Sequence, residues 1–137
     1  MRIVLDTNVI VSGLLNPEGN PGRIVDLLLA SEVTLLVDDR ILAEYRAVLR
    51  RSKFGLDSAD VSDFLDLLEA ESERVAAPPL GSKLPDESDR AFLEVALAAR
   101  ADSLVTGNIR HFRLAHLGPL AVESPAEFVH RWSRSRA

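Results

Sequence analysis

A short apolar segment of this chain ends directly on residues that could do chemistry. The run MRIVL is followed by Asp6, Thr7 and Asn8, which supply a carboxylate, a hydroxyl and an amide in succession. An apolar strand this short is typical of the interior of a parallel sheet, and ligands bind outside the carboxyl ends of such strands. The sequence therefore predicts a site at Asp6. The alternative is that Asp6 caps the segment that follows, since Asp is a favourable N-cap.

Further polar residues stand at the ends of other expected elements. Glu44 lies early in a helix that follows the second strand, Asp86 and Asp89 lie at the start of an apolar helix, and Thr106 and Asn108 follow a later strand. Carboxylates that meet at one sheet edge repel one another, and a hard divalent cation such as Mg²⁺ or Mn²⁺ compensates them through oxygen ligands. Such a cation can activate water and stabilise in-line displacement at phosphorus. The pattern therefore indicates a metal site.

Each of these acids also has a purely structural interpretation. Asp86 could be an N-cap, with Asp89 adding a favourable charge to the first turn of the helix. Glu44 could be a surface residue, because Tyr45 and Arg46 beside it are expected to be exposed on one side. Spacing alone leaves both interpretations open.

Length and composition fit one ordinary globular domain spanning residues 1–137. The chain is 47% hydrophobic and 27% charged, which is common for such domains. No apolar run approaches the roughly 18 residues needed to cross a bilayer, and the N-terminus lacks a secretory pattern. The chain has no cysteine, so disulfides and thiolate sites are excluded. We expect a cytoplasmic protein with no membrane partner.

The net charge of −5 argues against a protein that coats nucleic acid electrostatically, but not against an enzyme that acts on it. Basic residues do cluster locally, and the simplest interpretation of the clusters is solvated helix faces. They are Arg46, Arg50, Arg51 and Lys53; Arg110, His111, Arg113 and His116; and Arg131, Arg134 and Arg136.

Strands and helices are expected to alternate along the chain. Hydrophobic periodicity predicts strands at residues 2–6, 34–37, 103–106 and 120–122, and helices at residues 22–31, 39–51, 58–72 and 87–100. Residues 16–22 have the composition of a turn. Ser124, Pro125 and Glu127 predict a capping box that opens a final helix. This alternation favours a parallel sheet between helical layers.

Three blocks of the chain together resemble the PIN-domain ribonucleases. They are VLDTNVIVSGLL within residues 1–15, LVDDRILAEYRAVLRR at residues 36–51, and PDESDRAFLEVALAARADSLVTGN at residues 85–108. Each block carries an acid, and the blocks occur in order. The match is nearest to the PIN subfamily of toxin components of toxin–antitoxin systems, related to VapC toxins.

The resemblance implies an α/β fold, a three-layer α/β/α sandwich with a mostly parallel central sheet. It implies Mg²⁺- or Mn²⁺-dependent cleavage of single-stranded RNA, with Asp6, Glu44 and Asp89 as the catalytic, metal-binding acids and Asp86 joining through water. The chain would be the toxin of a type II pair. Its partners would be the RNA substrate and a cognate antitoxin, with a second copy of the chain as a further candidate.

The supporting polar positions implied by the resemblance are Thr7, Asn8, Thr106 and Asn108. Many PIN nucleases carry Asp where this chain has Asn108, and Ser88 stands where a further Asp is frequent in the subfamily. Asparagine can accept through its carbonyl but brings no charge. The expectation is therefore one well-held metal.

Other classes of protein fit less well. A phosphatase of the haloacid dehalogenase type would place an Asp two residues after its nucleophile, where this chain has Asn8, and would need a Lys near the last acids. A response-regulator receiver would place paired acids after the first strand, not at Asp38 and Asp39. A PIN domain kept as a non-catalytic binding module is the third alternative, and a metal-dependent nuclease assay separates it from an enzyme.

Overall fold

A parallel sheet organises the computed structural model of the chain, which describes residues 1–81, 83–112 and 118–136. Within these residues the strands are β1 (Arg2–Leu5), β2 (Thr34–Val37), β3 (Glu73–Arg74), β4 (Ser103–Val105) and β5 (Val122–Glu123). Their order across the sheet is β3-β2-β1-β4-β5, and every pairing is parallel. The chain therefore builds outward in one direction from β1 and then reverses to β4 on its other side. In open parallel sheets ligands bind at such a reversal, beyond the carboxyl ends of the strands.

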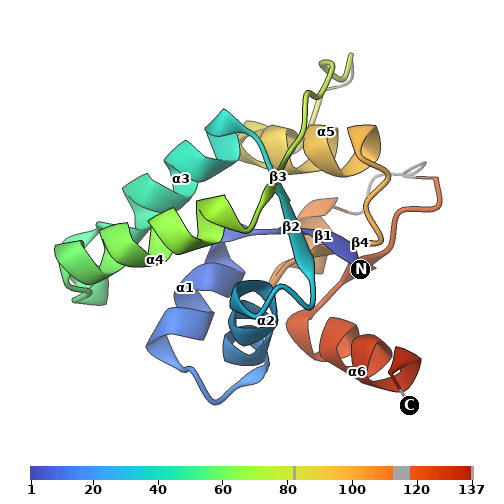
Figure 1. Cartoon of the computed structure of the whole chain (residues 1–137). Coiled ribbons are helices and arrows are strands. Elements are labelled where there is room, and N and C mark those ends of the chain that lie inside the picture. Colours follow the sequence, from blue (N-terminus) through green and yellow to red (C-terminus); the bar gives the residue numbers. More distant parts are fainter. Residues whose placement is uncertain (82, 113–117, 137) are drawn as a thin grey trace.

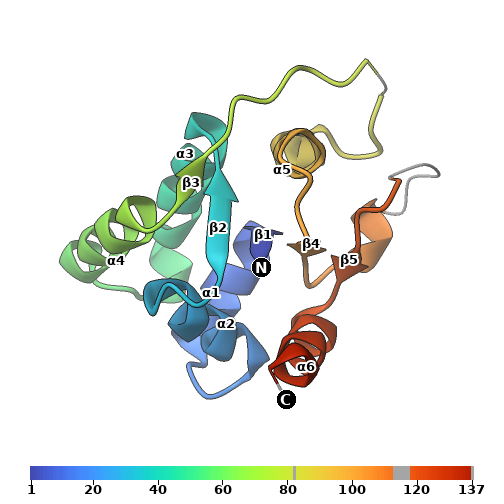
Figure 2. The ribbon, with the colours of Figure 1, turned by 45° about the vertical axis from the view of Figure 1, so that its right-hand side comes forward.

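Helices cover both faces of the sheet. They are α1 (Thr7–Leu15), α2 (Asn20–Leu29), α3 (Asp39–Leu49), α4 (Ser58–Ala70), α5 (Arg90–Ala98) and α6 (Pro125–Ser135), with short 3-10 helices η1 (Ser52–Phe54), η2 (Glu87–Asp89) and η3 (Ile109–Phe112). Figure 2 shows α5 on one side of the strands and α1, α2 and α6 together on the other, while α3 and α4 lie beside β2 and β3. This arrangement confirms the expected three-layer α/β/α sandwich.

The central strands are apolar because both of their faces are covered. Ile3, Val4 and Leu5 of β1 are each 0% exposed, as are Leu104 and Val105 of β4. Leu5 pairs with Val105 at the last position of the ladder. The residues that follow these two strands therefore emerge side by side at the carboxyl ends of β1 and β4. Figure 1 shows β1, β2 and β4 with α5 above them and α2 and α6 below.

Helix α1 was not among the expected elements. The β-branched run from Val9 to Val11 disfavours a helix by intrinsic propensity, yet all three residues are buried within one. Burial against neighbouring elements outweighs the small propensity cost. Close packing of the next segment needs Gly22, because a Cβ at that position would lie 2.1 Å from the Pro17 carbonyl oxygen.

Several boundaries differ from expectation. Helix α2 begins at Asn20 with Pro21 in its first turn, so the expected turn at residues 16–22 is shorter. The expected helix at residues 87–100 divides into η2 and α5. Strand β3 was not predicted, since its two residues are exposed and carry no apolar pattern. The last strand begins two residues later than expected, at Val122.

The start of α6 confirms the expected capping box. The Ser124 hydroxyl accepts from the Glu127 amide at 3.1 Å, and the Ser124 amide donates to Glu127 Oε1 at 2.9 Å. None of the helices in the described part of the chain has the length and apolar character needed to cross a membrane.

Candidate metal centre

The ends of β1 and β4 are joined by hydrogen bonds. The Asp6 amide donates to the Val105 carbonyl at 2.9 Å, and the Thr106 hydroxyl donates to Asp6 Oδ2 at 2.7 Å. Thr106 is itself 0% exposed and also accepts from the Asn108 amide at 3.0 Å. Asp6 is therefore held in a fixed orientation where the strand order reverses. Its side chain makes no capping hydrogen bond to α1, which leaves the capping interpretation without support.

Glu44 reaches this edge from α3. Its Oε2 accepts a hydrogen bond from the Thr7 hydroxyl at the start of α1. The neighbouring Tyr45 is 0% exposed and donates its hydroxyl to the Leu5 carbonyl at 2.5 Å. The expectation that Tyr45 is exposed on one side is therefore wrong. Its contact with the end of β1 fixes this turn of α3 beside Asp6, so Glu44 faces the site.

Asp89 is a buried acid at this edge of the sheet. It ends η2 at the point where α5 begins and is 6% exposed. Its Oδ2 atom is buried and has no hydrogen-bond partner within the described ranges. Burial is the largest of the causes that raise the pKa of Asp89 to about 6. The negative charges of Asp6 and Asp86 add to the rise, and the charge of Glu44 adds less. These interactions place Asp6, Asp86 and Glu44 within electrostatic reach of Asp89.

The pKa of Asp6 is raised as well. Burial is the main cause, and the hydrogen bond donated by Thr106 opposes it; the charge of Asp86 adds to the rise. Two carboxyl groups with raised pKa values at one sheet edge are typical of functional sites. Here burial is the main cause for both carboxyl groups, and the charges of neighbouring acids add to it.

Asp86 behaves differently from Asp89. It is exposed, and its Oδ1 accepts from the amide and the hydroxyl of Ser88 at 2.9 and 2.7 Å. These hydrogen bonds, the side-chain one first, lower the pKa of Asp86. Asp86 thus caps η2, yet it also lies near Asp89 and His111: a ligand atom of each falls within 4.8 Å of the others.

The supporting amides lie around these acids. Asn8 is exposed, and its Oδ1 accepts from the Gly107 amide at 3.2 Å, so it secures the loop after β4. Asn108 lies with its Nδ2 atom 2.9 Å from Nε2 of His111. Both amides therefore fix the edge of the site.

His111 belongs to the site but was assigned to a solvated basic cluster from the sequence. Its Nδ1 atom lies 3.6 Å from Asp89 Oδ2. The only feature of the sequence that could have indicated His111 as a site residue is its position three residues after Asn108, and that feature alone is too weak to predict it. Of the same cluster, Arg113 and His116 lie outside the described residues.

The donor set fits a divalent cation. A buried carboxylate oxygen without a donor is costly, and clustered carboxylates supply the oxygen ligands that Mg²⁺ and Mn²⁺ prefer. A cavity of about 530 Å³ lies elsewhere, lined in part by Arg100, Asp102 and Leu120 at the amino end of β4. It does not include the acids.

Comparisons with known proteins agree with this architecture. The family model described as PIN domain matches residues 2–110. An uncharacterized protein of Methanocaldococcus jannaschii is 26% identical over 146 aligned positions, which cover 98% of this chain and 93% of that protein.

A solved structure is also similar. It is the crystal structure of VapBC2 from Rickettsia felis bound to a DNA fragment from their promoter, in which one chain matches with a TM-score of 0.61 and 21% identity. The match covers 90% of this chain and 98% of that one. At this identity the likeness shows a shared fold.

Proposed function

The chain belongs to the PIN domain family, and from this premise we propose that it is an endoribonuclease that requires Mg²⁺ or Mn²⁺ and cleaves phosphodiester bonds of single-stranded RNA. The observation that carries the proposal is the buried Asp89 Oδ2 atom, which lacks a donor in the described part of the chain and lies within electrostatic reach of Asp6 and Glu44. A site that concentrates negative charge in this way is suited to a cation, not to an anionic substrate alone.

Each residue of the site has a role in this proposal. Asp6, Glu44 and Asp89 hold the metal, and Asp86 joins at the open side of the site. When bound, the divalent cation lowers the pKa of water and stabilises charge that develops at phosphorus. Thr106 orients Asp6 by donating to Oδ2, and Thr7 orients Glu44. Asn8 and Asn108 hold the loop after β4 against the same edge.

We further propose that the chain is the toxin of a type II toxin–antitoxin pair and acts in the cytoplasm. The support is the shared fold with a chain of the VapBC2 structure from Rickettsia felis. Its partner would be a cognate antitoxin protein, with self-association as a second candidate interaction. Co-expression with the product of a neighbouring small gene, followed by co-purification, would test the partner.

The activity is tested with end-labelled RNA. Single-stranded RNA, duplex RNA and single-stranded DNA are incubated with the protein in EDTA, Mg²⁺ or Mn²⁺. We expect cleavage of single-stranded RNA only with metal, and its loss in Asp6→Asn. The matched control is Asp66→Asn, which changes an exposed aspartate on α4 and should cleave as the wild type does.

The result also separates the alternatives. Binding of RNA without cleavage under any metal would favour a non-catalytic PIN module. Hydrolysis of a phosphomonoester without cleavage of RNA would favour a phosphatase, although Asn8, engaged with the Gly107 amide, offers no acid or base at that position.

A further inference from the structure

His111 is held close to the acids by the turn that carries it. It lies in η3, where the next residue, Phe112, is 0% exposed and anchors the turn in the core. The His111 amide donates to the Asn108 carbonyl at 3.1 Å. The imidazole side chain is 46% exposed. The backbone is thus fixed, while the ring remains open to a ligand from solvent.

The ring faces an oxygen that it does not satisfy. The 3.6 Å between His111 Nδ1 and Asp89 Oδ2 is too long for a hydrogen bond, and Asp89 Oδ2 is buried and has no other partner among the described residues. Two ligands that each bind one cation at about 2.1 Å lie roughly 3.0 to 3.6 Å apart when the bonds meet at about 90° to 115°. The separation therefore suits a shared cation better than direct contact.

Asp86 lies close to both of these residues. One ligand atom each from Asp86, Asp89 and His111 lie within 4.8 Å of one another. Asp86 is exposed, and the hydrogen bonds it accepts from Ser88 go to Oδ1. Asp86 can therefore supply an oxygen ligand while it still caps η2.

Asn108 can orient the imidazole as a ligand. A histidine that binds a metal usually donates its other ring N–H to an oxygen. Asn108 places its side-chain amide 2.9 Å from His111 Nε2, and a half-turn of that amide presents its carbonyl oxygen instead of its NH₂ group. The Asn108 backbone is tied to Thr106, which donates to Asp6. One chain of contacts thus links the imidazole to the first acid.

We propose that Asp86, Asp89 and His111 form a cation position with mixed nitrogen and oxygen ligands, in which His111 Nδ1 binds the metal. Asp89 belongs both to this position and to the group of acids that it forms with Asp6 and Glu44. This inference rests on the proposed function only in assuming that a divalent cation enters the site. Its consequence is selectivity. Imidazole suits the transition metals, whereas Mg²⁺ prefers oxygen and water, so the site favours Mn²⁺ over Mg²⁺.

Pulsed EPR on the full chain loaded with Mn²⁺ alone tests the nitrogen ligand directly. We expect modulation from a coordinated ¹⁴N nucleus, which changes to the ¹⁵N pattern when histidine is ¹⁵N-labelled and disappears in His111→Gln. The matched control is His130→Gln, which replaces an exposed histidine on α6 and should keep the signal. Circular dichroism confirms that each variant is folded.

Calorimetric titration with Mn²⁺ and with Mg²⁺ tests the selectivity. In His111→Gln the Mn²⁺ Kd should rise about tenfold or more, while the Mg²⁺ Kd should change by less than about threefold because its ligands are oxygens. Asp86→Asn should weaken both metals.

The outcomes separate this inference from the proposed function. Mn²⁺ that binds without a nitrogen signal, in a protein that still cleaves RNA, overturns the role of His111 and leaves the function intact. A nitrogen signal in a protein that cleaves no RNA supports the cation position and overturns the function. Absence of Mn²⁺ binding to the wild type overturns both.

Discussion

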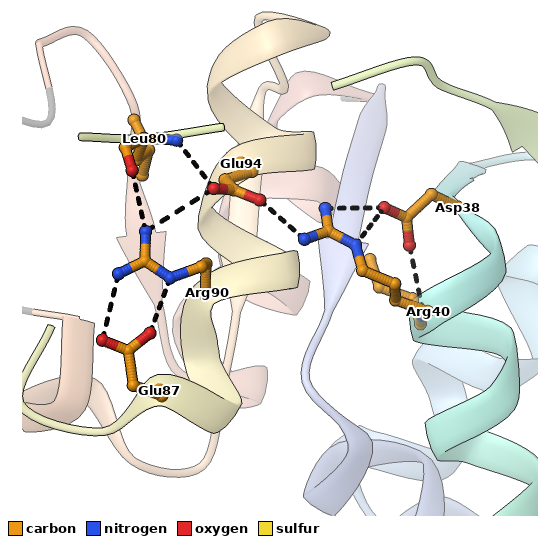
Figure 3. Close-up of polar contacts among 7 residues, drawn as sticks. Asp38, Arg40, Leu80, Glu87, Arg90 and Glu94 are labelled. Atoms are coloured by element: carbon orange, nitrogen blue, oxygen red, sulfur yellow. Dashed lines mark hydrogen bonds and ion pairs between the residues drawn. The ribbon is translucent and has the colours of Figure 1, made fainter. Parts of the chain in front are cut away.

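Asp89 and Glu94 are two buried carboxylates on the same stretch of chain, and their surroundings are opposite. Glu94, on α5, is 3% exposed and accepts from the Arg40 guanidinium at 2.6 Å and from the Leu80 amide at 2.7 Å. Arg90 lies 3.6 Å away. Figure 3 shows Glu94 between the two arginines, with Asp38 and Glu87 on their outer sides. Asp89 is 6% exposed, and its Oδ2 has no hydrogen-bond donor in the part of the chain described.

The two pKa values move in opposite directions for this reason. Burial raises the pKa of Glu94, but the hydrogen bonds from the Leu80 amide and Arg40 and the charges of both arginines outweigh it, and the net pKa is lowered. Burial also raises the pKa of Asp89, and there the neighbouring acids add to the rise. Burial of an acid is therefore no sign of function in itself. The absence of donors, together with other acids, is what indicates a cation site.

The largest expected difference between the two acids is in catalysis. Asp89→Asn should reduce metal-dependent RNA cleavage by on the order of a thousandfold, which corresponds to several kcal/mol of transition-state stabilisation. Glu94→Gln should retain most of the activity in protein that is still folded. Single-turnover cleavage at saturating Mn²⁺ measures both.

Asp86→Asn is the intermediate case in that assay. Because Asp86 is exposed and already engaged with Ser88, we expect it to leave a measurable fraction of the activity. If Asp86→Asn inactivates the protein and Asp89→Asn does not, the roles of the two acids are reversed.

Stabilisation by metal should depend on Asp89 and not on Glu94. At a free Mn²⁺ concentration of about 100 Kd, binding to the folded state alone adds about 2.7 kcal/mol to the free energy of unfolding. Thermal unfolding with and without Mn²⁺ should show this rise in the wild type and in Glu94→Gln, and little of it in Asp89→Asn. An equal rise in all three proteins would place the metal elsewhere.

Loss of Glu94 should instead weaken the metal-free fold. Glu94→Gln removes the charge that pairs with Arg40 and holds the Leu80 segment to α5, so we expect a loss of about 2 kcal/mol, as for hydrogen bonds to charged groups. Asp89→Asn should leave the metal-free protein as stable as the wild type or more stable, because it removes a buried, repelled charge. Urea unfolding in EDTA compares them. Glu87→Gln, at an exposed partner of Arg90, is the control and should cost much less than Glu94→Gln.

The last difference between the two acids is in the pH dependence of the metal-free protein. The pKa of Asp89 is about 6 in the folded state against 3.8 ordinarily, so the folded protein binds more protons than the unfolded chain in this window. The contribution of Asp89 to stability therefore rises as the pH falls from 7 towards 4, and Asp89→Asn should lose that contribution. The lowered pKa of Glu94 acts in the opposite sense, with stability lost as the pH falls below 4.5. Urea unfolding in EDTA at several pH values measures both slopes; parallel curves for wild type and Asp89→Asn would contradict this difference.

Much of the fold could be predicted because it depends on local pattern. The strand at residues 34–37 was predicted with its observed bounds, and the capping box at Ser124 with its observed partners. Helix α1 could not be predicted, because its burial against other elements outweighs the low helix propensity of its residues. Strand β3 could not be predicted, because its two residues carry no apolar pattern. The PIN family itself was indicated by three blocks of sequence.

The sequence by itself determined which polar residues follow the strands. Asp6 and Thr106 had to lie at one edge of the sheet, because parallel strands end at a common edge. That they are neighbours follows from the pairing of β1 with β4 in the tertiary structure. Which buried acid has donors was decided only by the tertiary structure. Arg40 and Leu80, both distant from Glu94 along the chain, turn towards it. No donor in the described residues does the same for Asp89 Oδ2. Hydrogen bonds between distant segments depend on how the layers pack, and no local pattern in the sequence encodes them.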